Sequence, residues 1–92
     1  MKQTESKYFF SPDLYQSAAL VLLLNSRPEF KLVNGKILFG FPITDGLYRA
    51  MAEYNSGAPL NALEYSQSIK RLKAEMIMRR SMGNAGASHA LH

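Results

Sequence analysis

Cysteine is absent from this 92-residue chain. The absence excludes disulfide bonds, thiolate nucleophiles and cysteine-based zinc sites. A chain without disulfides suits the reducing cytoplasm, which is the compartment that we expect for this protein.

A hydrophobic run of membrane-spanning length is also missing. The longest apolar run covers residues 18–24, far short of the roughly 20 residues that a transmembrane helix needs. The run also begins too late, behind a start of mixed charge, to be the apolar core of a signal peptide. We therefore interpret it as part of a buried helix and expect no membrane association.

Side chains that commonly perform catalysis or bind metals are few and scattered. The only histidines, His89 and His92, lie in a segment predicted to be disordered, which cannot hold a base against a substrate. The acidic residues are spread along the chain rather than clustered: Glu5, Asp13, Glu29, Asp45, Glu53, Glu64 and Glu75. The glycine spacing does not match a phosphate-binding loop. We expect neither enzymatic activity nor a metal, a cofactor or a small-molecule ligand.

The clearest structural signal is a β-hairpin around Asn34 and Gly35. This dipeptide favours a two-residue turn, because both central positions of a type I′ turn need a positive φ angle. The turn predicts strands over residues 29–33 and 36–41. In the register that it imposes, one face of the hairpin collects five large apolar side chains: Phe30, Leu32, Ile37, Phe39 and Phe41. We expect helices to bury that face, since an isolated hairpin is marginally stable in water.

Helical patterns flank the hairpin. Apolar residues at helical spacing predict helices over about residues 12–24, 45–55 and 61–78. Residues that typically cap helices lie at the expected starts: Ser11 with Pro12, Thr44 or Asp45, and Asn61 with Glu64. Gly57 is expected to end the second helix in a left-handed conformation.

Together these elements predict one α+β domain over residues 7–80. A small antiparallel sheet, to which residues 7–10 add a short third strand, is covered on one face by three helices. Residues 1–6 and 81–92 are expected to be disordered ends.

The C-terminal third of the chain carries the whole net charge of +4. Residues 1–64 hold six basic and six acidic side chains, whereas residues 65–92 hold five basic and one acidic. Two interpretations stay open: a solvated helix face, or a nucleic-acid interface. The candidate nucleic-acid contacts are Lys70, Arg71, Lys73, Arg79 and Arg80. The core positions predicted for Phe30, Phe39 and Phe41 argue against single-strand binding by aromatic stacking.

Self-association is the competing interpretation. The outer face of the predicted sheet keeps apolar side chains, and two apolar residues of the third helix lie off its buried stripe. The candidate contacts between copies are Val33, Leu38, Ile77 and Met78. An open sheet edge adds to the surface that a second copy could cover.

Four segments carry a resemblance to a known family. They are Tyr-Phe-Phe-Ser-Pro-Asp-Leu-Tyr at 8–15, Ile-Leu-Phe-Gly-Phe at 37–41, Tyr-Asn-Ser-Gly at 54–57 and Tyr-Ser-Gln-Ser-Ile-Lys-Arg-Leu-Lys at 65–73. Together they resemble a small bacterial family catalogued as a domain of unknown function, over about residues 8–76. The resemblance implies a small cytoplasmic accessory protein and no site residues.

We therefore expect a non-enzymatic protein-interaction module whose partner is a second copy of itself. The alternative is a nucleic-acid-associated accessory protein that uses the basic third helix.

Overall fold

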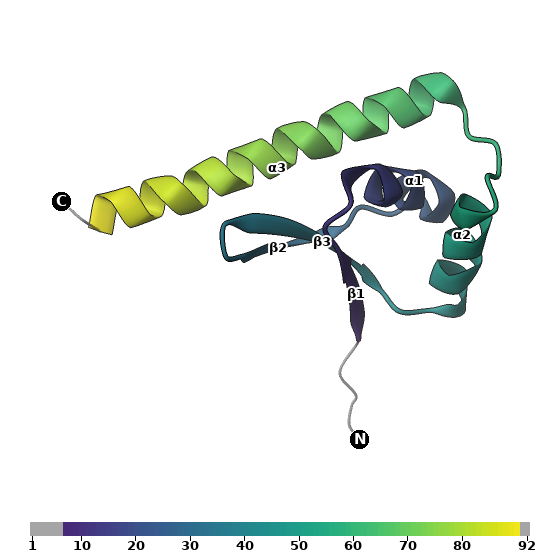
Figure 1. The fold of residues 1–92 in the computed structure, drawn as a ribbon, viewed down its shortest axis with the longest axis horizontal. Coiled ribbons are helices and arrows are strands. Elements are labelled where there is room, and N and C mark those ends of the chain that lie inside the picture. The colour runs from purple at the N-terminus through teal and green to yellow at the C-terminus, as the bar shows by residue number, and fades with distance from the viewer. Residues whose placement is uncertain (1–6, 91–92) are drawn as a thin grey trace.

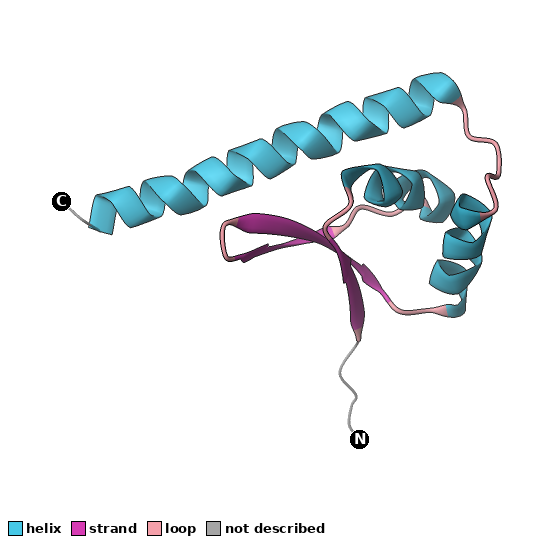
Figure 2. Cartoon of the chain, in the orientation of Figure 1, coloured by secondary structure: helices cyan, strands magenta, loops and turns pink. Residues whose placement is uncertain are grey.

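The computed structural model describes residues 7–90, with side chains described up to Met82. The elements are β1 (Tyr8–Ser11), α1 (Leu14–Leu24), β2 (Glu29–Val33), β3 (Lys36–Pro42), α2 (Asp45–Asn55) and α3 (Ala62–Ala90). The predicted α+β fold is confirmed (Figure 1, Figure 2). The predicted disordered segment at residues 1–6 lies outside the described residues, as do residues 91–92.

The strands form one antiparallel sheet in the order β1–β3–β2. In the hairpin Phe30 faces Phe39, which is the predicted register. Both turn residues have positive φ angles, 52° at Asn34 and 79° at Gly35. The turn chemistry read from the sequence is therefore confirmed.

The predicted third strand is present at the other side of β3. It begins at Tyr8, one residue later than expected, and pairs Phe9 with Phe41 and Phe10 with Gly40. Because side chains alternate along a strand, Phe9 lies on the inner face of the sheet and Phe10 on the outer face.

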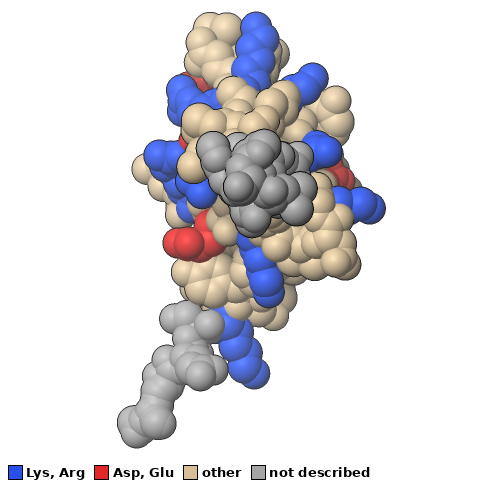
Figure 3. Space-filling view, turned by 90° about the vertical axis from the view of Figure 1, so that its left-hand side faces the viewer, with Lys and Arg blue, Asp and Glu red and all other residues tan. Residues whose placement is uncertain are grey.

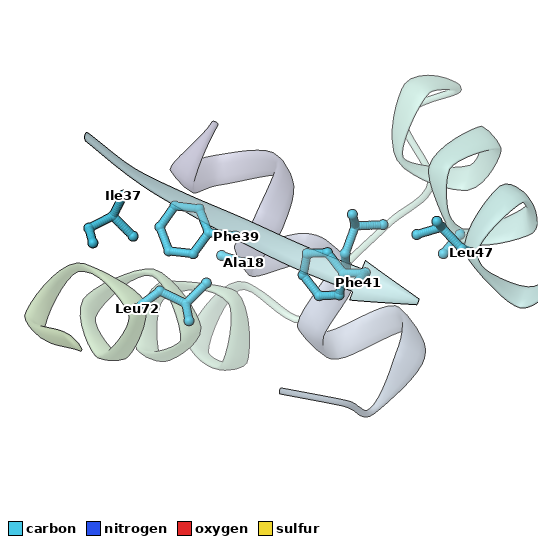
Figure 4. Close-up of a cluster of buried hydrophobic side chains, with 8 residues drawn as sticks. Ala18, Ile37, Phe39, Phe41, Leu47 and Leu72 are labelled. Carbon is cyan, nitrogen blue, oxygen red and sulfur yellow. The ribbon is translucent and has the colours of Figure 1, made fainter. Parts of the chain in front are cut away.

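The core lies between the inner face of the sheet and the helices (Figure 4). Phe39 and Phe41 of β3 are fully buried, and Ala18 of α1 and Leu72 of α3 belong to the same cluster. Helix α1 packs against both other helices. The small side chain of Ala18 lets the backbones approach closely where the elements meet.

Burial of all five apolar residues on the inner face was expected, and this is wrong for the edge strand β2, whereas Ile37 of β3, directly opposite Leu32, is only 5% exposed. Leu32 is 46% exposed and Phe30 is half-buried. Figure 1 shows that α1 lies at the far end of the hairpin, so only α3 passes over the part next to the turn. A single helix, about 10 Å wide, covers two strands incompletely.

Helix α1 begins two residues later than predicted. The N-cap is Asp13, whose carboxylate accepts hydrogen bonds from the amides of Tyr15 and Gln16 at 2.9 and 3.1 Å. Ser11, the expected cap, lies outside the helix, where its hydroxyl donates to the side chain of Gln16 at 2.8 Å. A carboxylate interacts with the positive end of the helix dipole more strongly than a hydroxyl does.

The predicted starts of α2 and α3 agree with the structure. The hydroxyl of Thr44 accepts a hydrogen bond from the amide of Leu47 at 3.0 Å, and the side chain of Asn61 accepts one from the amide of Glu64 at 2.9 Å. Gly57 follows α2 with a φ angle of 80°, as expected for a left-handed helix stop.

Helix α3 continues to Ala90, beyond the end predicted at residue 78, and takes up residues 81–90 of the predicted tail. Extending an existing helix requires no new nucleation step, so each added residue gains a hydrogen bond at little cost. Three alanines in residues 81–90 favour the helix and offset the two glycines.

Candidate interaction surfaces

The basic residues predicted to contact nucleic acid are all exposed on α3, but they do not share one side of it. Residues three, four or seven apart lie on the same side of a helix. Lys70, Lys73 and Arg80 therefore share a side, with Ile77 between them. We call Lys70, Lys73 and Arg80 the basic side of α3.

Arg79 faces the hairpin instead of solvent alone. Its guanidinium carbon lies 4.3 Å from the centroid of the Phe30 ring, a cation–π arrangement on the inner face of the sheet. The contact partly shields the Phe30 ring, which is half-buried.

Arg71 lies on the opposite side of α3 from Lys73. It lines a hollow of about 390 Å³ at the end of α1, beside Asn25 and Ser26. There it is placed to complement the negative end of the α1 dipole. The five predicted contacts are thus divided among three directions. Figure 3 accordingly shows Lys and Arg on several sides of this end of the molecule rather than in one field.

The residues predicted to mediate self-association are likewise divided. Val33 and Leu38 lie on the outer face of the sheet, whereas α3 passes over the inner face. Ile77 and Met78 are 50% and 53% exposed, but neighbouring residues of a helix point about 100° apart. The four residues are accessible but do not form one surface.

A different apolar strip follows the edge of β2. Met78 and Met82 share a side of α3 with Glu75, which forms an ion pair with Arg27, two residues before β2. This side of α3 therefore borders β2, where the exposed Leu32 lies. We call Leu32, Met78 and Met82 the edge strip; Met82 is 64% exposed.

The outer face of the sheet carries two aromatic rings. The rings of Tyr8 and Phe10 lie 5.9 Å apart at an interplanar angle of 25°. The Nζ atom of Lys31 lies 5.0 Å from the centroid of the Phe10 ring. A hollow of about 430 Å³ opens beside these residues and is also lined by Glu29 and Phe30. We call it the outer-face hollow.

The sequence contained a signal for this aromatic pair, although reasoning from the sequence did not use it. Three aromatic residues in a row on a strand must divide between its two faces, so Phe9 inward implies Tyr8 and Phe10 outward. Gly40, directly opposite Phe10, marks the place where a ring can lie on the backbone.

The hydroxyl of Tyr65 joins α3 to α1. It donates a hydrogen bond to the carbonyl of Tyr15 at 3.0 Å. Burial, with a further effect from the neighbouring Tyr54, raises the pKa of Tyr65 above its ordinary value of 10.0. This tyrosine stays protonated at physiological pH, so we assign it a structural role.

Among residues 7–82, whose side chains the structure describes, no three His, Asp or Glu residues come together as metal ligands. None of the helices in this part of the chain combines the length and the apolar character needed to cross a lipid bilayer.

The comparisons with known proteins yield no match: no protein family, no curated protein and no solved structure resembles the chain closely enough. The resemblance to a bacterial domain of unknown function stays a prediction. Function must be argued from the surfaces described above.

Proposed function

We propose that the chain is a protein-interaction module that self-associates through the edge of β2 and the adjoining edge strip. The observation that carries this proposal is the open edge itself: β2 pairs with β3 on one side, and no other described strand pairs with its far side. An unpaired strand edge is a template for a strand of another chain.

The peptide groups of β2 suit such pairing. In a hairpin with a two-residue turn, the two residues that flank the turn exchange backbone hydrogen bonds with each other, and so does every second residue pair beyond them. Phe30 and Leu32 therefore direct their N–H and C=O groups away from β3. Their side chains lie on the inner face, the face over which α3 passes.

The dimensions of the molecule favour a partner. Its radius of gyration is 15.1 Å, compared with about 12 Å for a compact domain of this length. Figure 1 shows that α3 runs over α1 and then extends past the hairpin turn. A long helix gains most of its stability from packing, and the last residues of α3 whose side chains are described, Ser81 and Met82, are both exposed.

A symmetric dimer accounts for both the open edge of β2 and the extended shape of the molecule. Antiparallel pairing of β2 with the same strand of a second copy joins two three-stranded sheets into one of six strands. A two-fold axis at Phe30 places Glu29 opposite the partner's Lys31 twice, so the pairing is also complementary in charge.

Sedimentation velocity from low to high micromolar concentration tests this proposal. We expect a dimer whose fraction rises with concentration and which dissociates in the double variant Met78→Lys plus Met82→Lys. Ile77→Lys is the matched control, because Ile77 is equally exposed but lies on another side of α3. A monomer throughout, or equal effects of both variants, would contradict the proposal.

The basic side of α3 supports nucleic-acid binding as a second candidate. Lys70, Lys73 and Arg80 form a row along the helix that can follow a phosphate backbone. Titration with DNA and RNA across salt concentrations tests it. Affinity should fall steeply with salt and be lost in Lys70→Glu plus Lys73→Glu, whereas Arg71→Glu, on the opposite side of α3, serves as the control. No binding at low salt would exclude this candidate.

A further inference from the structure

The Phe10 ring forms a preformed flat surface on the outer face of the sheet. It lies against Gly40, since a Cβ atom added to that glycine would collide with two ring carbons, one of them at 2.8 Å, and would press on a third at 3.1 Å. The ring occupies the space that a side chain at position 40 would take, and the Lys31 ammonium lies over it. The ring is half-buried, so its position is held by the sheet rather than by a mobile loop.

Tyr8 continues this surface along the same strand. Its ring is 5.9 Å from that of Phe10 and close to parallel with it. The two stacked, half-buried rings on a rigid strand offer a π surface on which flat, unpaired rings of a ligand can continue the stack. Stacking of this kind tolerates any nucleobase, because every base has a π face.

The charges around the two rings complement a phosphate backbone. Lys31 reaches over Phe10, and Lys36 lies further along the same face of the hairpin. Glu29 is the only carboxylate that lines the outer-face hollow. The whole chain carries a net charge of +4, so the long-range field also attracts an anionic strand.

We propose that the outer face of the sheet binds a single strand of nucleic acid. Tyr8 and Phe10 stack on consecutive bases, and Lys31 contacts the phosphate between them. The strand is unpaired because bases in a duplex are stacked on each other and cannot reach the rings. The site shares no residue with the edge strip or with the basic side of α3, but its Glu29 and Lys31 also face each other across the proposed β2 pairing, whereas Tyr8 and Phe10 lie on β1, away from that pairing.

Glu29 gives the site a base preference. A carboxylate accepts hydrogen bonds from exocyclic amino groups such as that of cytosine, and thymine has none. An oligo(dC) strand should therefore bind more tightly than an oligo(dT) strand. Glu29→Gln, whose amide can both donate and accept, should reduce that difference.

Fluorescence anisotropy with labelled strands of about 12 nucleotides tests the proposal. The probes are single-stranded DNA, single-stranded RNA and a DNA duplex at low salt. We expect the single strands to bind more tightly than the duplex. Phe10→Leu and Tyr8→Leu keep an apolar side chain but remove the π face, and each should weaken binding roughly five- to 150-fold.

Tyr48→Leu is the matched control, because Tyr48 is an exposed tyrosine on α2, away from the sheet. It should leave the affinity unchanged. Lys31→Ala leaves both rings in place and should lower the slope of log affinity against log salt by about 0.7. Circular dichroism of each variant separates loss of binding from loss of fold.

Several results would overturn the proposal. They are absence of binding at low salt, equal affinity for the duplex, and unchanged affinity in folded Phe10→Leu and Tyr8→Leu proteins. If binding is lost in the double variant Lys70→Glu plus Lys73→Glu but not in the sheet variants, the binding site lies on α3. Tyr8 and Phe10 lie on β1, outside the proposed β2 pairing, so loss of single-strand binding in Phe10→Leu and Tyr8→Leu while the dimer persists would support this inference separately from self-association.

Discussion

At the scale of a single residue, Gly40 determines which side chain covers the outer face of the sheet at that position. Because this position has no side chain, the ring of Phe10 can lie across the central strand and approach Lys31 of β2. A flat ring over a glycine replaces the contacts that a side chain would make there.

Gly40→Ala should therefore destabilise the protein by about 1–3 kcal/mol, since the new methyl group overlaps the Phe10 ring. Gly46→Ala is the matched control: its added Cβ meets only ordinary contacts in the first turn of α2, and we expect a gain of about 0.4–1 kcal/mol. Urea denaturation followed by circular dichroism measures both. Equal effects at the two glycines would contradict the packing described for Phe10.

At the scale of elements, α1 joins the three helices, because it packs against both α2 and α3. Its buried Ala18 and Ala19 admit close neighbours, and the hydroxyl of Ser68 in α3 donates a hydrogen bond to the carbonyl of Ala18 at 3.0 Å. A second bond, from Tyr65 to the carbonyl of Tyr15, lies one turn away on the same pair of helices. The contact between α1 and α3 is thus both packed and hydrogen-bonded.

Tyr65→Phe removes one of these bonds and should cost about 0.5–1.5 kcal/mol in the free energy of unfolding. Tyr48→Phe, at an exposed tyrosine, should be neutral. Thermal denaturation of the two variants against the parent protein decides between these outcomes.

The raised pKa of Tyr65 adds a pH dependence of known sign. The folded state holds the phenol proton more tightly than the unfolded chain, so this stabilisation is present below pH 10.0 and is lost as pH rises through the folded pKa. The parent protein should therefore lose stability in alkaline solution more steeply than Tyr65→Phe. Parallel curves for the two proteins would contradict this assignment.

At the scale of the whole molecule, the body is thin, with principal extents of 49 × 42 × 17 Å. A body this flat has one buried layer, and the described core depends on a few large side chains such as Phe39, Phe41 and Leu72. Stability should be correspondingly sensitive to any one of them.

Leu72→Ala should cost about 2–5 kcal/mol, a large part of the total stability of a domain of this size. Leu63→Ala, at a 67% exposed leucine of the same helix, should change stability by less than about 0.5 kcal/mol. Chemical denaturation of both variants tests the expectation. Similar losses would mean that α3 is not anchored through Leu72.

Local features of the fold could be predicted because their causes are local. The hairpin register depends on a two-residue turn, and the starts of α2 and α3 depend on side chains within three residues of the amides that they cap. The end of α3 escaped prediction, because the balance of alanine and glycine near a helix end is close to neutral.

The sequence by itself determined the strands, their pairing and the residues available to the core, since turn chemistry and alternation act between neighbours. Only the tertiary structure decided that Arg79 stacks on Phe30, that Leu32 stays exposed, and that Phe10 covers Gly40 beside Lys31. Each of these features involves segments that are distant in the chain, and each depends on how α3 and β1 pack against the hairpin. The candidate surfaces belong to this second group, because a surface is made by the relative placement of elements and not by the pattern within any one of them.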